Sequence, residues 1–185
     1  QPRIGITLED SQKTMFTKIF SSNPGIDFYT NAISDIYQDL FGEGIFTGKG
    51  IYDLEIYQKL MKNTLPENRI LSHDLIEGNY LRCALLSDVV LLDSFPNQYL
   101  SYLEREKRWI RGDWQIASWI EKLINQKRNP INNISKFKIF DNLRRSILPI
   151  SELLILIIAI GKENIILLTM ILISLFINSI LELIN

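Results

Sequence analysis

The chain has 185 residues, the size of one domain, and its 20 basic and 21 acidic side chains leave a formal net charge of −1 at pH 7. Its polar part carries about as many acids as bases, which argues against nucleic acid as a partner. Cys83 is the only cysteine, so an intrachain disulfide is excluded and a cysteine-based metal site is disfavoured.

The first third of the chain is predicted to form short elements joined by turns. Residues 3–8 alternate like a strand, residues 9–20 and 27–41 have helical spacing, and Asp53 is expected to cap a helix that runs to about residue 63. Residues 42–50 are expected to form a glycine-rich loop around a short strand. The glycine spacing of this loop does not fit a P-loop, so we expect a tight turn in which the backbone approaches a ligand.

The middle of the chain is predicted to contain two further helices and one strand. Residues 66–72 form a loop that leads into a helix over 74–86, and residues 88–92 are expected to form a strand. Residues 97–127 are predicted to form one long helix or a broken pair, with Gly112 at the break.

Residues 131–147 are predicted to form an amphipathic helix. Apolar residues recur there at spacings of three and four, with basic residues between them: Ile134, Phe137, Phe140, Leu143 and Ile147 against Lys136, Lys138, Arg144 and Arg145. Such a helix suits the surface of a lipid bilayer, where basic side chains meet anionic headgroups. The same apolar stripe also fits a helix packed on the rest of the domain, and both interpretations stay open.

Two nearly continuous apolar runs follow this helix. Residues 147–160 and 165–184 flank a short polar loop, and the second run is close to the roughly 20 residues needed to cross a bilayer. We interpret residues 148–185 as a transmembrane helical hairpin; two buried helices of a bundle are the alternative. The basic flank before the hairpin predicts a multi-pass protein of the cell inner membrane, with the polar part in the cytoplasm.

Asp74 is the first candidate catalytic residue. It follows His73 and precedes Glu77 at the junction of a loop and a helix, and such a carboxylate can act as a general base if it reaches the proton it removes. The local sequence alone favours a structural role, in which Ser72 or Asp74 caps the helix and Glu77 lies in its first turn. A zinc-binding role for His73 is disfavoured because the chain has no second histidine.

Residues 105–119 hold a cluster of basic and aromatic side chains, namely Arg105, Lys107, Arg108, Trp109, Arg111, Trp114 and Trp119. Arginine suits bidentate binding of phosphate oxygens. Tryptophan faces suit the apolar faces of sugar rings. A solvated basic face with tryptophans in the core is the structural alternative.

Longer segments add to these residues, namely Gln1-Pro-Arg-Ile-Gly-Ile6 and residues 32–44, 46–53, 66–78, 108–115 and 138–146. Together they resemble the glycosyltransferase domain of cyclic β-1,2-glucan synthases, enzymes related to the processive family-two transferases such as cellulose synthase. His73-Asp74 stands in the place of the Thr-Glu-Asp motif of the wider group, and Arg105-x-x-Arg108-Trp109 resembles its Gln-x-x-Arg-Trp motif. The chain departs from these motifs at His73, where Glu is usual, and at Arg105, where Gln is usual.

The resemblance implies a fold class and roles for individual residues. The fold would be α/β, with residues 1–130 as the acceptor-side, C-terminal half of a GT-A-like glycosyltransferase domain, followed by the interface helix and the transmembrane hairpin. Asp74 would be the base, and the donor diphosphate would be bound by Arg105, Arg108 and Arg111. The acceptor sugar would contact Trp109, Trp114 and the loop Phe46-Thr47-Gly48.

The implied reaction is inverting transfer of glucose from UDP-glucose to a growing glucan, in cyclic β-1,2-glucan synthesis. The chain contains no Asp-x-Asp motif, which in this superfamily holds the metal and the uridine. We therefore expect Mg²⁺ or Mn²⁺ only in the complete enzyme, with no metal ligands in this chain. The expected partners are UDP-glucose, the glucan acceptor, the lipid bilayer and a missing N-terminal catalytic half. The chain alone would be inactive; the alternative is a remnant or split-gene half that acts only as a membrane-anchored protein.

Overall fold

The computed structural model describes residues 1–21, 35–62, 64–66, 68–121, 123–124 and 127–184. By compactness the chain divides into two units, residues 1–141 and residues 142–185. The start of the helix expected over 27–41 lies outside the described residues.

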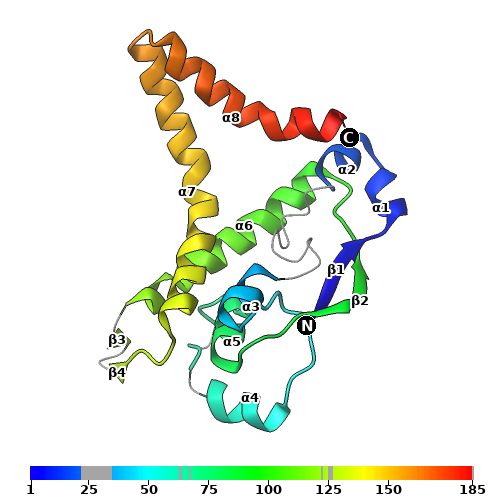
Figure 1. Cartoon of the computed structure of the whole chain (residues 1–185), viewed down its shortest axis with the longest axis vertical. Helices are drawn as coiled ribbons and strands as arrows, with labels where there is room; N and C mark the ends of the chain where they lie inside the picture. Colours follow the sequence, from blue (N-terminus) through cyan, green and yellow to red (C-terminus); the bar gives the residue numbers. More distant parts are fainter. Residues whose placement is uncertain (22–34, 63, 67, 122, 125–126, 185) are drawn as a thin grey trace. The chain divides into compact units, whose positions relative to one another are not determined.

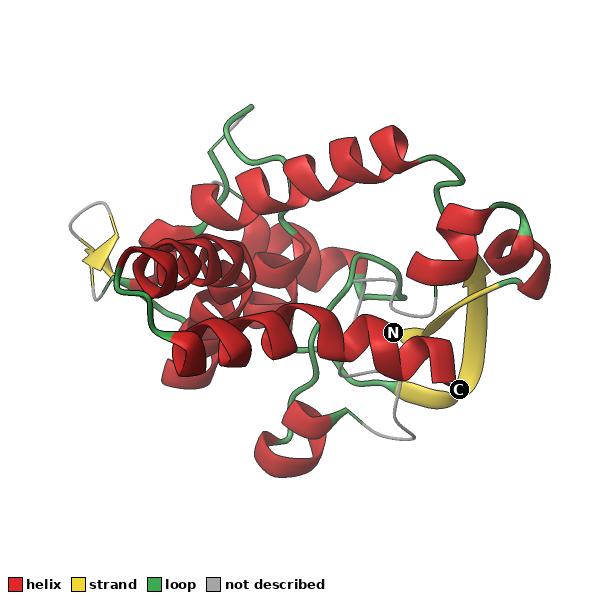
Figure 2. Cartoon of the chain, turned by 90° about the horizontal axis from the view of Figure 1, so that it is seen from above, coloured by secondary structure: helices red, strands yellow, loops and turns green. Residues whose placement is uncertain are grey.

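Helices dominate the described residues, and the strands form two small sheets (Figure 2). In the first, β1 (Pro2–Ile6) pairs in parallel with β2 (Leu86–Asp93), with Ile4 opposite Leu91 and Ile6 opposite Asp93. In the second, β3 (Leu123–Ile124) pairs antiparallel with β4 (Lys127–Arg128). The expected α/β class is therefore wrong for the described residues, which form a mixed, mainly helical structure with two-stranded sheets.

The strand expected inside the glycine-rich loop does not form. Three backbone N–H groups of this loop donate to acceptors outside any strand: Gly44 to the Cys83 carbonyl at 2.7 Å, Ile45 to the Asp35 carboxylate at 3.0 Å, and Thr47 to the Gln1 side chain at 2.9 Å. A strand needs these groups for its ladder. The segment is instead a loop tied to three separate parts of the chain.

Short helices with polar caps make up the first part of the chain. The expected helix over 9–20 is two helices, α1 (Leu8–Gln12) and α2 (Met15–Phe20), because Thr14 starts the second with a capping box to Thr17. Asp35 caps α3 (Ile36–Phe41), and Asp53 caps α4 (Leu54–Met61) as expected.

Two helices follow on either side of β2. The first, α5 (Asp74–Leu81), is shorter than expected, and the second, α6 (Tyr99–Gln115), passes through Gly112 without a break before a 3₁₀ turn, η1 (Ala117–Ile120). A Cβ at Gly112 would lie 2.5 Å from the Cβ of Ser72. This glycine therefore allows close packing of α6 on the segment before α5, and the expectation of a break there was wrong.

The core of the first unit joins these helices. Seven side chains form one buried apolar cluster: Met61, Leu75, Ile76, Ile116, Trp119, Ile131 and Ile139. Most of them come from α4, α5, the segment from the end of α6 through η1, and the start of α7 (Asn133–Gly161). Leu75 and Ile76 of α5 and Ile116 after α6 belong to this cluster, so the cluster holds the start of α5 close to the end of α6. Figure 1 labels both helices.

The part of α7 in the first unit packs by a face that the sequence did not predict. Phe137 and Phe140, expected on the buried stripe, are about half exposed, whereas Lys138 is 3% exposed and Ile139 is fully buried. Lys138, expected on a basic face toward lipid headgroups, donates to the carbonyls of Glu43 and Gly44 at 3.3 and 3.0 Å. The placement of Lys138 on a basic face toward lipid headgroups is therefore wrong, while an interface role for residues 131–147 stays a prediction.

The second unit contains the rest of α7 and α8 (Ile165–Ile184). The two helices join through a turn at residues 162–164, and Ser174 of α8 donates to Glu152 of α7 at 3.1 Å. The interface helix was expected to end at residue 147, but α7 continues beyond it as one helix. Pro149 lies inside this helix and has no backbone N–H to donate a helical hydrogen bond.

Among the described residues, no helix combines the length and the apolar character that crossing a bilayer requires. The expectation of a transmembrane hairpin is therefore wrong. The multi-pass inner-membrane location and the bilayer as a partner rested on that hairpin and have no support in the structure.

Candidate functional site

Asp74 is the first residue of α5, and its carboxylate is not used as a helix cap. His73 is the N-cap residue, and no side chain donates or accepts a capping bond there. Among the described residues, the Asp74 carboxylate makes no hydrogen bond or ion pair. The capping role that the local sequence favoured is therefore not observed, and the side chain is available to a ligand.

The loop Phe46-Thr47-Gly48 lies directly against Asp74. Gly48 has φ +86°, and a Cβ at this position would lie 2.8 Å from Cγ and Oδ1 of Asp74. Only glycine combines this backbone conformation with so close an approach. The structure thus brings together two segments that the resemblance assigned to one site, the predicted acceptor loop and the predicted base.

Further contacts hold this loop in place. Phe46 packs on α5, where a Cβ at Gly78 would lie 2.5 Å from the Phe46 Cβ. The N–H and hydroxyl of Thr47 both donate to Oε1 of Gln1, at 2.9 and 3.0 Å. Lys49 pairs with Asp93 at the end of β2, and this bond lowers the pKa of Asp93.

Helix α6 packs on the segment before α5. Besides the close approach of Gly112 to Ser72, the Leu71 N–H donates to the Gln115 side chain at 2.8 Å. This packing carries Arg108 near enough to Asp74 for its charge to act on the carboxylate. The predicted base and one residue predicted to bind phosphate therefore lie near each other.

Burial raises the pKa of Asp74, and the nearby Glu77 carboxylate raises it further. The charges of His73 and Arg108 oppose this rise. A carboxylate with a raised pKa holds a proton more readily than an exposed aspartate, which suits a general base.

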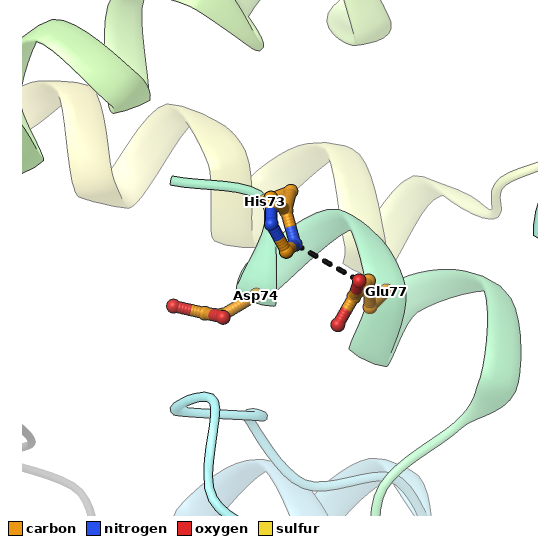
Figure 3. A group of neighbouring side chains, drawn as sticks. All are labelled: His73, Asp74 and Glu77. Carbon is orange, nitrogen blue, oxygen red and sulfur yellow. Dashed lines mark ion pairs between the residues drawn. The ribbon is translucent and has the colours of Figure 1, made fainter. Parts of the chain in front are cut away.

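His73 and Glu77 form a polar pair at the start of α5, and the Asp74 carboxylate points away from this pair (Figure 3). Glu77 is buried, and its Oε1 accepts from the Tyr57 hydroxyl at 2.7 Å and lies 2.9 Å from Nδ1 of His73. The Glu77 hydrogen bond and burial raise the pKa of Tyr57 to about 12. No local pattern in the sequence marked Tyr57, because it lies on α4, far along the chain from Glu77.

The three arginines predicted to bind the donor diphosphate differ in their surroundings. Arg108 and Arg111 are exposed. The Arg105 guanidinium instead lies over three aromatic rings, 5.1 Å from Phe95, 5.7 Å from Tyr102 and 4.8 Å from Trp109. Tyr102 and Trp109 are three and four residues from Arg105 on the same helix, so helical spacing could have revealed this contact.

The two tryptophans predicted to bind acceptor sugar also differ. Trp109 is partly buried and has the Arg105 guanidinium over its ring, whereas Trp114 is 53% exposed. This geometry tests neither assignment, so both stay predictions.

His73, Asp74 and Glu77 carry potential metal-ligand atoms within 4.8 Å of one another. Their arrangement does not fit a cation well. The Glu77 oxygen nearest His73 already accepts from Tyr57, and Figure 3 shows the Asp74 carboxylate pointing away from the His73–Glu77 pair. A divalent cation would need these acceptors turned toward one point.

No protein-family model matches the chain. Among curated proteins, it is similar to the cyclic beta-(1,2)-glucan synthase NdvB of Rhizobium meliloti (strain 1021), with 44% identity over 154 residues. The match covers 83% of this chain and 5% of the relative's length, so the chain spans a small part of that protein. The similarity supports the relationship to cyclic β-(1,2)-glucan synthases that the motifs indicated, while the GT-A-like assignment stays a prediction.

Proposed function

We propose that this chain is the acceptor-side part of a glucan-synthesising transferase, which moves glucose from UDP-glucose to a growing β-glucan with inversion. The observation that carries the proposal is the unpaired Asp74 carboxylate, which lies against Gly48 and within reach of the Arg108 charge. The 44% identity to NdvB supports the same class of reaction.

In the proposed reaction, Asp74 accepts the proton of the attacking hydroxyl of the glucan. The oxygen of that hydroxyl forms a bond to the anomeric carbon of the donor glucose, and the bond from this carbon to the phosphate oxygen of UDP breaks. Arg108 and Arg111 offset the charge on the departing diphosphate, because exposed guanidinium groups bind phosphate oxygens in pairs. The loop Phe46–Gly48 and Trp109 hold the acceptor sugar beside Asp74.

The donor-binding part of this enzyme is proposed to lie outside the chain. The sequence contains no Asp-x-Asp motif, and the candidate cluster around Asp74 does not fit a divalent cation. The Mg²⁺ or Mn²⁺ expected for the complete enzyme is therefore assigned to that other part, and no step proposed above runs through it.

A chimera tests the proposal. The segment of NdvB that matches this chain is replaced by the chain, and incorporation of glucose from UDP-glucose into glucan is measured. The chimera should be active, and Asp74→Asn should lower the rate at least about 100-fold, because a general base contributes about 10² to 10⁴ in rate.

Asp88→Asn is the matched control, because Asp88 is an exposed carboxylate on β2, outside the segments assigned to the site. It should leave the rate unchanged. Activity that survives Asp74→Asn would refute the assignment of the base. A chimera that folds and binds UDP-glucose but transfers none would favour the alternative of an inactive remnant.

A further inference from the structure

Glu77, His73 and Tyr57 form a connected group in which one oxygen serves two neighbours. Oε1 of Glu77 accepts from the Tyr57 hydroxyl at 2.7 Å and lies 2.9 Å from Nδ1 of His73. The Glu77 side chain is 9% exposed and the His73 side chain 47% exposed. One end of the group is therefore fixed in the protein, and the other faces solvent.

The hydrogen bonds determine which nitrogen of His73 carries the proton. The pKa of Tyr57 is about 12, so its hydroxyl stays protonated and donates to Glu77. The same Glu77 oxygen is an acceptor, so Nδ1 of His73 must supply the hydrogen of the second bond. In the neutral imidazole, Nε2 then carries a lone pair and can accept a hydrogen bond.

Two hydrogen-bond acceptors, Nε2 of His73 and the Asp74 carboxylate, thus come from consecutive residues at the start of α5. One ring nitrogen of His73 and one carboxylate oxygen of Asp74 lie within 4.8 Å of each other. Neighbouring hydroxyls of a sugar ring stand on adjacent carbons, so acceptors on these two consecutive residues are near enough to meet two such hydroxyls.

We propose that His73, held in its Nδ1–H form by Glu77 and Tyr57, accepts a hydrogen bond from the acceptor-sugar hydroxyl next to the one that Asp74 deprotonates. This inference rests on the proposed function for its substrate. His73 is the binding group, and Glu77 and Tyr57 are positioning residues that fix its tautomer. The site would select acceptors with two adjacent free hydroxyls.

The first test measures the tautomer directly and needs no activity. The chain has one histidine, so the ¹⁵N signals of histidine-labelled chain belong to His73 alone. In the neutral imidazole we expect a protonated Nδ1 and an unprotonated Nε2. Glu77→Gln, which keeps an acceptor oxygen, should preserve this form, whereas Glu77→Leu should shift His73 toward Nε2–H. Tyr57→Phe is the milder variant if Glu77→Leu does not fold, and it should weaken the preference for Nδ1–H. A parent chain with mainly Nε2–H would overturn the proposal.

The second test uses the NdvB chimera and measures kcat and KM for the glucan acceptor. His73→Gln can place an amide oxygen near the position of Nε2, and His73→Asn cannot reach it. We expect His73→Asn to raise KM about 10-fold with a smaller change in kcat, in line with the loss of one hydrogen bond to substrate, and His73→Gln to recover most of the loss.

An acceptor that lacks the neighbouring hydroxyl separates binding from structure. Removing this hydroxyl should weaken binding of the acceptor to the parent chimera, but should weaken binding to the His73→Asn chimera much less. If removing the hydroxyl weakens binding equally in the two chimeras, the role of His73 is overturned, even if Asp74→Asn abolishes transfer. Conversely, the tautomer result stands if the transferase proposal fails, so the two failures can be told apart.

Discussion

At the scale of single residues, burial raises the pKa of Asp74 because folding removes water from its carboxylate. Between the ordinary value near 3.8 and the raised value in the folded chain, the folded state binds more protons than the unfolded state. The free energy of unfolding therefore falls as pH rises through this window. At neutral pH the ionised Asp74 costs stability, which is in line with the catalytic role proposed for it.

Asp74→Asn should consequently stabilise the chain, whereas it should slow transfer by the NdvB chimera. At about pH 7 its free energy of unfolding in urea should equal or exceed that of the parent, and at about pH 3 the difference should vanish because Asp74 is then protonated. Circular dichroism at both pH values measures the change, with Asp88→Asn as the control that shows no gain. A clear loss of stability for Asp74→Asn at neutral pH would mean that the carboxylate makes a favourable contact in the folded state.

At the scale of elements, local signals predicted some parts well. Alternation found β1, a strand was expected at residues 88–92 inside β2, and Asp53 correctly marked the start of α4, because these signals depend on nearby residues. The start of α5 was also found, although its cap was not. These local features were enough to place Asp74 correctly at a loop-to-helix junction.

Other features depended on contacts between distant segments and could not be read locally. A break was expected at Gly112 from its low helix propensity, yet the glycine is needed for the close approach of Ser72. The buried face of α7 was misassigned because Lys138 pairs with Glu43, which lies far away in sequence. The Tyr57–Glu77 bond was missed for the same reason.

Gly112→Ala tests whether α6 packs on the segment before α5 as closely as described. The added Cβ would meet Ser72 at 2.5 Å, and we expect a loss of about 1–3 kcal/mol in the free energy of unfolding because the helix must shift. Thermal or urea unfolding measures it. The shift should also weaken the influence of Arg108 on Asp74, since α6 carries Arg108.

Gly161→Ala is the matched control, because a Cβ there meets nothing within 4 Å. It should be neutral or slightly stabilising, as alanine has the higher helix propensity. If Gly112→Ala is as stable as Gly161→Ala, then the close packing of α6 on Ser72 is not present in solution.

At the scale of the whole molecule, the expected α/β class came from the resemblance and not from the number of strands in the sequence. Two segments with strand character pair with each other, but most side chains along β2 stay exposed. Parallel sheets are ordinarily covered on both faces. Strand signals alone cannot show how many strands join a sheet, so the class could not be settled from this sequence.

Long-range polar contacts do connect distant parts of the first unit. The Lys138 ammonium lies 3.5 Å from Oε1 of Glu43, donates to the carbonyls of Glu43 and Gly44, and lies 5.2 Å from the Tyr37 ring. Burial lowers the pKa of Lys138, and the Glu43 charge opposes that change. The pair joins α7 to the start of the loop that lies against Asp74.

Lys138→Met should therefore destabilise the first unit strongly. Glu43 would stay buried without its main cation, and breaking such a buried pair costs about 3–5 kcal/mol. Lys136→Met, the same change on the same helix at a partly exposed position, should change the free energy of unfolding little. The double variant Glu43→Leu with Lys138→Met should recover most of the loss, because an apolar pair of similar size carries no desolvation cost. If Lys138→Met instead matches Lys136→Met in urea unfolding, the pair does not hold α7 to the loop, and the position of the loop beside Asp74 must depend on its other contacts, such as those with Gln1 and Asp35.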